Sequence, residues 1–188
     1  VPGNPGYFTV QRKDGSLSYY GDGAAQGNNG SAPGLNGNGP IVTWSISRFQ
    51  DSVGNAIRFQ YTNNSTTNEQ RINRIDYAYG SAGGQTTNSN TYWQFSYAPR
   101  PDAISGYVAG SKIQRTQRLS MITSYNNGVE LRRYALTYRP TDSVNYQSYV
   151  QQLSECVGSS CLSPTTFNWD LNNGGFQTGN PVWSVAGS

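Results

Sequence analysis

Apolar and polar residues alternate one by one along much of the chain beyond residue 40. Val42, Trp44 and Ile46 alternate with Thr43 and Ser45. The same alternation recurs at residues 57–61, 75–79, 93–97 and 134–138. A period of two places the apolar side chains on one face of a β-strand and the polar side chains on the other. The pattern therefore predicts a succession of strands with little or no helix, and only the segment 146–153 is ambiguous between the two.

Short turn signals separate these segments. Lys13-Asp14-Gly15-Ser16 lies between two β-prone runs, and Asn126-Asn127-Gly128 lies between residues 118–125 and 130–139. Asp-Gly and Asn-Gly favour tight hairpin turns because glycine adopts a positive φ without steric cost. Both segments are therefore predicted to be antiparallel hairpins.

Other breaks in the alternation predict strand ends. The stretches 62–70 and 80–90 are rich in Asn, Thr and Gly, which favours loops. Pro99 and Pro101 are expected to close the preceding strand, because proline cannot donate a hydrogen bond to a neighbouring strand.

The strands together predict an all-β, antiparallel fold. An open sheet of about eight to ten such strands must curl or split into two layers. We therefore expect a curved sheet, a two-layer sandwich or an open, barrel-like shell segment. The expected organisation is a hairpin at 1–20, a flexible Gly/Asn-rich loop at 21–40, the main domain at 41–170, and a tail or linker at 171–188.

Composition supports an ordered domain with an aromatic core. The chain has 188 residues, including 14 Tyr, 6 Phe and 4 Trp, and only 12% are charged. Disordered chains combine few aromatic residues with many charges, which is the opposite balance. The net charge of +3 is small and its basic residues are dispersed, so no nucleic-acid partner is expected. The sequence also lacks an apolar run long enough to span a membrane, and it begins at Val1 without a signal-peptide pattern, as an excised or processed piece would.

The chain has no histidine, which excludes histidine-based catalytic triads, metal sites and proton shuttles. Its two cysteines lie in Cys156-Val-Gly-Ser-Ser-Cys161. They are too few for a structural metal site and are not spaced as a Cys-x-x-Cys redox motif. We expect a local disulfide around the Gly-Ser-Ser turn, with free thiols as the alternative, and neither a metal nor a cofactor.

Ten carboxylates are available for acid–base catalysis, and Asp76 and Asp102 are the best candidates because each adjoins an aromatic strand. A glycosidase would need two of them facing each other across a cleft. The simpler interpretation is that Asp76 pairs with a neighbouring arginine and that Asp102 caps a turn after Pro101. We favour this interpretation, and the chain is expected not to be an enzyme.

Exposed tryptophans could stack on sugar rings. The candidate ligand-binding residues are Trp183, Trp93 and Trp44, with a glycan as the possible partner. Trp44 and Trp93 are in phase with apolar neighbours, which favours a place in the core. Trp183 follows Pro181 in the Gly-rich tail and is expected to be the most exposed.

Several segments occur in an order that matches a known family. They are Phe8-Thr9-Val10 with Lys13-Asp14-Gly15 and Tyr20-Gly21; residues 44–48 with Asp51, Gly54-Asn55 and Ile57; Ile75-Asp76-Tyr77 with Tyr79-Gly80; Phe95, Tyr97, Arg100, Pro101 and Asp102; Arg118-Leu119, Ile122, Tyr134, Leu136 and Tyr138; and Cys156, Cys161, Pro164, Thr165, Phe167 and Trp169. In this order they resemble the SpvB-like domain of insecticidal toxin-complex B subunits and related Rhs (YD-repeat) proteins. The resemblance covers residues 7–170.

The resemblance implies a secreted, non-catalytic module in the wall of a hollow β-shell that encloses or supports a toxic cargo domain. Its expected partners are other domains of the same large polypeptide or other toxin-complex subunits. The Arg…Ser-Thr-Ser…Glu-x-Glu signature of the ADP-ribosyltransferase domain that accompanies the namesake protein is absent. The alternative function is a carbohydrate- or receptor-binding β-domain of a bacterial surface or secreted protein.

Overall fold

The computed structural model describes residues 5–21, 31–33, 41–82, 85–108, 110–140 and 147–169. All regular structure in these residues is β, as the alternation predicts. Consistent with this, none of the described residues forms a helix that is long and apolar enough to cross a membrane. The strands are β1 Tyr7–Gln11, β2 Leu17–Gly21, β3 Ser31–Pro33, β4 Ile41–Trp44, β5 Ile46–Gln50, β6 Asn55–Asn64, β7 Glu69–Ala82, β8 Gln85–Val108, β9 Ser111–Asn126, β10 Val129–Tyr138, β11 Val150–Val157, β12 Ser160–Cys161 and β13 Thr165–Thr166.

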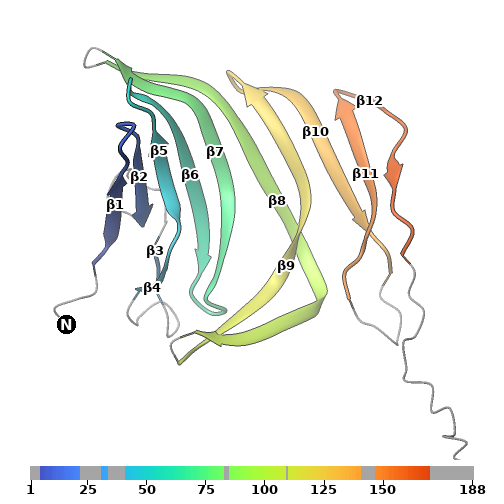
Figure 1. The fold of residues 1–188 in the computed structure, drawn as a ribbon. Helices are drawn as coiled ribbons and strands as arrows, with labels where there is room; N and C mark the ends of the chain where they lie inside the picture. The colour runs from blue at the N-terminus through green and yellow to red at the C-terminus, as the bar shows by residue number, and fades with distance from the viewer. Residues whose placement is uncertain are drawn as a thin grey trace, which may run out of the picture.

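Eleven of these strands form one antiparallel sheet. Its order is β1-β2-β5-β6-β7-β8-β9-β10-β11-β12, with β13 also paired to β11, and β3 and β4 form a separate two-stranded sheet. The central strands are long and bend together, so the sheet is a curved layer that does not close into a barrel (Figure 1). Of the predicted alternatives, the structure shows the curved sheet.

The predicted hairpins are present, but several predicted strand ends are wrong. β6 continues to Asn64 and β7 begins at Glu69, so only a four-residue turn remains of the loop expected at 62–70. The loop expected at 80–90 is largely occupied by the end of β7 and the start of β8. The ambiguous segment near residue 150 enters strand β11.

The two prolines do not end their strand either. β8 runs through both of them, and its pairing with β9 shifts between Pro99 and Ile104. A bulge leaves backbone groups out of the ladder, so a residue without an N–H is tolerated there. The prolines therefore mark a bulge in a long strand.

The pairing register sorts the side chains onto two faces. Phe59, Ile75 and Trp93 lie side by side across three strands, and Phe95 pairs with Ile122 on the same face. The described residues supply no second sheet over this face, so a row of this kind keeps part of its surface exposed. Among the described hydrophobic residues only Ala56 and Cys156 are buried. The predicted aromatic core is therefore wrong in this respect, and Trp44 and Trp93 are half-buried.

A tyrosine recurs at the bulges of alternate strands. Pairing shifts at Tyr61 in β6, at Tyr97 in β8 and at Tyr138 in β10. Each hydroxyl donates a hydrogen bond to a carbonyl of the preceding strand in the sheet, at 2.8, 2.7 and 2.6 Å respectively. The three sites share the local sequence apolar-polar-Tyr, at residues 59–61, 95–97 and 136–138. This repetition identifies a common hairpin unit within the sheet.

Candidate functional site

The end of the long β8–β9 hairpin bends away from the rest of the sheet. Figure 1 shows its lower part running beneath β6 and β7. Two hydrogen bonds fasten it to the β6–β7 turn: the Gln114 amide donates to the Thr67 carbonyl at 2.8 Å, and the Asn68 side-chain amide donates to the Lys112 carbonyl at 2.7 Å. The bend creates a corner lined by polar side chains from four strands, β4, β7, β8 and β9.

Glu69 forms the buried centre of this corner. Its carboxylate accepts hydrogen bonds from the Thr116 hydroxyl at 2.9 Å, the Thr116 amide at 3.2 Å and the Gln117 amide at 3.4 Å. An ion pair with Arg71 at 3.0 Å supplies the compensating charge. A buried carboxylate is stable only when it is paired and hydrogen-bonded in this way, so Glu69 ties the bent end of β9 to the start of β7.

Arg71 and Tyr97 form the next layer of the corner. The guanidinium carbon of Arg71 lies 5.3 Å from the centre of the Tyr97 ring, within cation–π distance. Burial raises the pKa of Tyr97, whose hydroxyl donates to the Ile72 carbonyl. The tyrosine therefore stays neutral and acts as a fixed hydrogen-bond donor.

Asp102 links the bulge of β8 to the segment that precedes β11. It accepts two hydrogen bonds from Arg100, each 3.0 Å long, and one from the Ser148 amide at 2.7 Å. The Arg100 hydrogen bonds hold the pKa of Asp102 well below its usual range. The Ser148 hydroxyl also accepts a hydrogen bond from Arg118 at 2.9 Å. The expected turn cap is thus wrong: Asp102 lies within β8 and joins two distant segments.

A cavity of 430 Å³ opens between these groups. It is lined by Thr43, Glu69, Gln70, Arg71, Ile72, Tyr97, Arg100, Ile113, Arg115 and Gln117. A second hollow beside it contains Arg100, Asp102 and Ser148. Sequence reasoning missed this site, because its side chains are separated by up to 74 residues and meet only through the bend in the β8–β9 hairpin.

The two carboxylates considered for catalysis are both engaged by arginines. Arg74 contacts Asp76 at 2.6 Å, and the Gln60 side-chain amide donates to the same carboxylate at 2.8 Å. The predicted pairing of Asp76 with a neighbouring arginine is confirmed. In the part of the chain that the structure describes, no three His, Cys, Asp or Glu side chains group as metal ligands.

The two candidate tryptophans that the structure describes have separate aromatic partners. Trp93 contacts Tyr134 on the apolar face, with ring centres 6.1 Å apart. Trp44 packs edge-on against Phe8 and donates to the Pro5 carbonyl at 2.8 Å. Trp183 lies outside the described residues. These side chains therefore form no common sugar-binding surface among the described residues.

Trp169 is more exposed than either of the two described candidates. It is 47% exposed, lies beside Tyr149 and donates to the Val150 carbonyl at 2.6 Å. Its place directly after the last strand, β13, is the signal that could have drawn attention to it.

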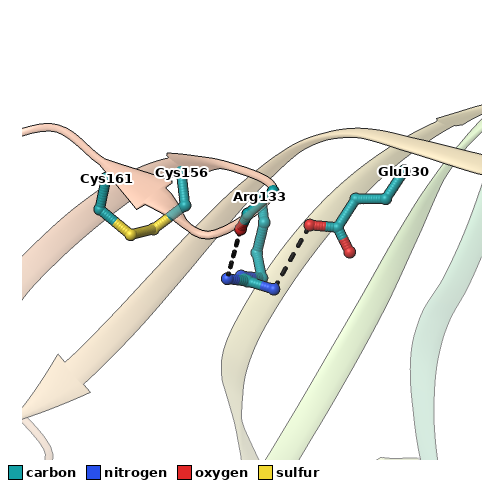
Figure 2. Close-up of a disulfide and its surroundings, with 5 residues drawn as sticks. Glu130, Arg133, Cys156 and Cys161 are labelled. Atoms are coloured by element: carbon teal, nitrogen blue, oxygen red, sulfur yellow. Dashed lines mark hydrogen bonds and ion pairs between the residues drawn. A yellow bond between two sulfur atoms is a disulfide. The ribbon is translucent and has the colours of Figure 1, made fainter.

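The two cysteines lie opposite each other in β11 and β12. Cys156 pairs with Cys161 in the strand register, and a disulfide joins them. The intervening turn uses Gly158 at φ 57°, whose carbonyl accepts a 3.4 Å hydrogen bond from Arg133. Arg133 also forms an ion pair with Glu130 (Figure 2). The disulfide thus closes the last hairpin at one edge of the sheet.

Comparison of the sequence with family models and with curated proteins gives no match. Comparison of the structure with solved structures gives several matches. The crystal structure of TcdB2-TccC3 without its hypervariable C-terminal region matches with a TM-score of 0.66 and 12% identity, over 82% of this chain and 10% of that chain. The N-terminal domain of the effector protein SpvB from Salmonella typhimurium strain LT2 matches with a TM-score of 0.65 and 10% identity, over 81% of this chain and 61% of that one.

The Tc holotoxin pore of Photorhabdus luminescens gives a similar result, with a TM-score of 0.64 and 14% identity. This chain shares the fold of the part of each of these proteins that it matches. It spans only about a tenth of the Tc chains and 61% of the SpvB domain chain. Because the sequence identities are low, the similarity concerns the fold alone. It does not identify the activity or the partners of this chain.

Proposed function

We propose that this chain is a non-catalytic wall module of a secreted, toxin-complex-like β-shell that encloses or supports a toxic cargo domain. The observation that carries the proposal is the curved, open antiparallel sheet, whose fold is shared with Tc toxin subunits and the SpvB N-terminal domain. Its partners would be other domains of the same polypeptide or other subunits of the complex.

The edges of the sheet support a role within a larger structure. β1 pairs with β2 on one side and has no strand partner on the other among the described residues. At the opposite edge, β12 and β13 each cover only two residues of β11. Open strand edges present unpaired backbone groups that further strands can satisfy.

The half-exposed apolar face supports the same interpretation. An antiparallel sheet with one apolar face is normally covered by a second layer. Here the described part of the chain supplies little cover, and most of its large apolar side chains keep some exposure. Neighbouring parts of a shell or its contents would remove this face from water.

The side-chain chemistry favours a mechanical role. Glu69, Asp76 and Asp102 are each paired with an arginine and hydrogen-bonded further. In this arrangement the three carboxylates accept hydrogen bonds that hold strands together.

Hydrogen–deuterium exchange tests the proposal by comparing the isolated chain with the longer polypeptide that would carry it. We expect the amides of β1 and β13 to exchange quickly in the isolated chain and slowly in the longer polypeptide. β7, which is paired on both sides, is the internal control and should exchange alike in both. Equal exchange of β1 in the two samples would contradict a wall module that is extended at its edges.

A glycan array combined with tryptophan fluorescence tests the alternative function. The wall module predicts no saturable glycan binding and no quenching. Saturable binding that quenches tryptophan fluorescence would favour a carbohydrate-binding domain and count against the proposal.

A further inference from the structure

The corner cavity contains more hydrogen-bond donors than acceptors. Arg71 forms one ion pair, with Glu69. Its Nε is buried and has no hydrogen-bond partner among the described residues. Each guanidinium has five N–H donors, so Arg71 keeps donors on its two Nη atoms besides the buried Nε and the one that faces Glu69. Glu69 accepts four hydrogen bonds within the protein, three at Oε2 and one at Oε1.

Arg115 gives the cavity an unneutralised positive charge. The described residues give its guanidinium neither an ion pair nor a hydrogen bond, and the residue is exposed at the cavity wall. Of the other two arginines of the wall, Arg71 is neutralised by Glu69 and Arg100 by Asp102. An incoming anion would therefore meet Arg115 and the spare donors of Arg71 and Arg100.

The volume and the wall of the cavity restrict which chemical group can be attached to the anion. Ile72, Ile113 and the Tyr97 ring supply apolar wall beside the arginines. The volume of 430 Å³ far exceeds the roughly 30 Å³ share of one water molecule and lies in the range of small-ligand sites. An inorganic ion would leave the apolar wall uncovered, whereas a carboxylate on a short aliphatic stem would cover it.

We propose that the corner cavity binds a carboxylate carried on a short aliphatic stem, with Arg115 as its main charge partner. Arginine suits this role because its planar fork matches the two oxygens of a carboxylate. Two sources have this chemistry: a free dicarboxylic acid and the acidic side chain of a polypeptide. The site does not depend on the proposed wall function.

Titration calorimetry of the chain with glutarate and with N-acetylglutamate amide tests the proposal. We expect saturable binding with a Kd of about 1 mM or below for at least one of them, weakened by added salt. Tighter binding of glutarate identifies the free acid as the source, and tighter binding of the amide identifies an acidic side chain. Neutral glutaramide and inorganic phosphate should both bind at least about tenfold more weakly.

Variants locate the site. Arg115→Gln should weaken carboxylate binding about tenfold, because it removes the charge partner while the backbone keeps its place in the β8–β9 pairing. Lys112→Gln removes the same charge from the same hairpin outside the cavity and should change binding less than about twofold. Absence of saturable binding, equal effects of the two variants, or binding of glutaramide or phosphate as tight as that of glutarate would overturn the proposal.

Discussion

Tyr61, Tyr97 and Tyr138 show how a single side chain can hold a bend in a sheet. Each lies at a pairing shift and donates its hydroxyl hydrogen bond back to the preceding strand. A bulge removes ladder hydrogen bonds and increases local twist. Here the shift lies in the pairing with the following strand, and the tyrosine hydroxyl fastens the bulged residue to the strand on its other side. Burial raises the pKa of all three phenols.

Tyr97→Phe should therefore lower the free energy of unfolding by about 1–2 kcal/mol, because the Ile72 carbonyl loses its donor while the ring remains. Urea denaturation measures this loss. Tyr107→Phe is the matched control, since Tyr107 is 73% exposed, and it should change stability by less than about 0.5 kcal/mol. Equal losses for the two variants would show that the hydroxyl of Tyr97 contributes nothing specific.

Asp102 should make the stability of the chain dependent on acid pH. Its folded-state pKa is lowered, first by the hydrogen bonds from Arg100. A lowered pKa means that the carboxylate stabilises the fold above its unfolded pKa of about 4, and that this contribution is lost as pH falls towards the folded pKa. Asp102→Asn should thus lower the free energy of unfolding by about 1–3 kcal/mol at pH 7.

Urea denaturation between about pH 2 and 7 checks the sign of this effect. The difference between the original chain and Asp102→Asn should shrink below about pH 4. A double-mutant cycle with Arg100→Gln should give a coupling energy of about 0.5–3 kcal/mol at pH 7. A difference that stays constant with pH, or a coupling energy near zero, would contradict an Arg100–Asp102 interaction that stabilises the fold.

At the scale of elements, the hairpins follow directly from local sequence. Asp51 accepts hydrogen bonds from the amides of Val53 and Asn55, as expected of an Asp that starts a turn. Asn127 and Gly128 both have a positive φ, the requirement that makes Asn-Gly a hairpin signal. The existence and the antiparallel direction of the strands that flank these turns were therefore predictable.

The extent of the strands was not predictable in the same way. The polar ends of β6, β7 and β8 carry no apolar alternation, and they pair because their neighbours extend the ladder. The bend of the β8–β9 hairpin depends on contacts between Thr67 and Gln114, which lie 47 residues apart. Without that bend the corner cavity could not be foreseen, although each of its residues is visible in the sequence.

Gly128→Ala tests the turn chemistry of the β9–β10 hairpin. Gly128 has φ 79°, and a Cβ added there would meet nothing within 4 Å. The cost is therefore conformational, and we expect a loss of about 1 kcal/mol in the free energy of unfolding. Gly106→Ala in β8 has equal space without a positive φ, so its stability should be unchanged or slightly higher. Equal losses in thermal or urea denaturation would contradict this account.

At the scale of the whole molecule, alternation reveals one apolar face but not what covers it. Sandwiches and single curved layers share the same period of two. The choice between them depends on long-range pairing, here a continuous run of hairpins from β5 to β10. Trp44 and Trp93 are in phase with apolar neighbours in the sequence, but the degree of their burial could not be inferred from that phase.

An open sheet of this size should also associate through its edges when it is isolated. β1 is exposed along its whole length and carries Tyr7, Phe8 and Val10. Natural edge strands avoid such pairing with charges or prolines, and the small net charge of +3 gives little repulsion. The average mass of the isolated chain, measured by sedimentation, should accordingly rise with concentration.

Val10→Lys should suppress this rise, because a charge on the edge strand opposes the approach of a second strand. Val53→Lys adds the same charge at a residue that is 72% exposed in the β5–β6 turn, away from the edge. It should leave the association unchanged. If both variants suppress association equally, net charge is responsible. If neither variant suppresses association, the isolated chain associates through another surface. That result would contradict the proposal that further strands of a shell pair with β1.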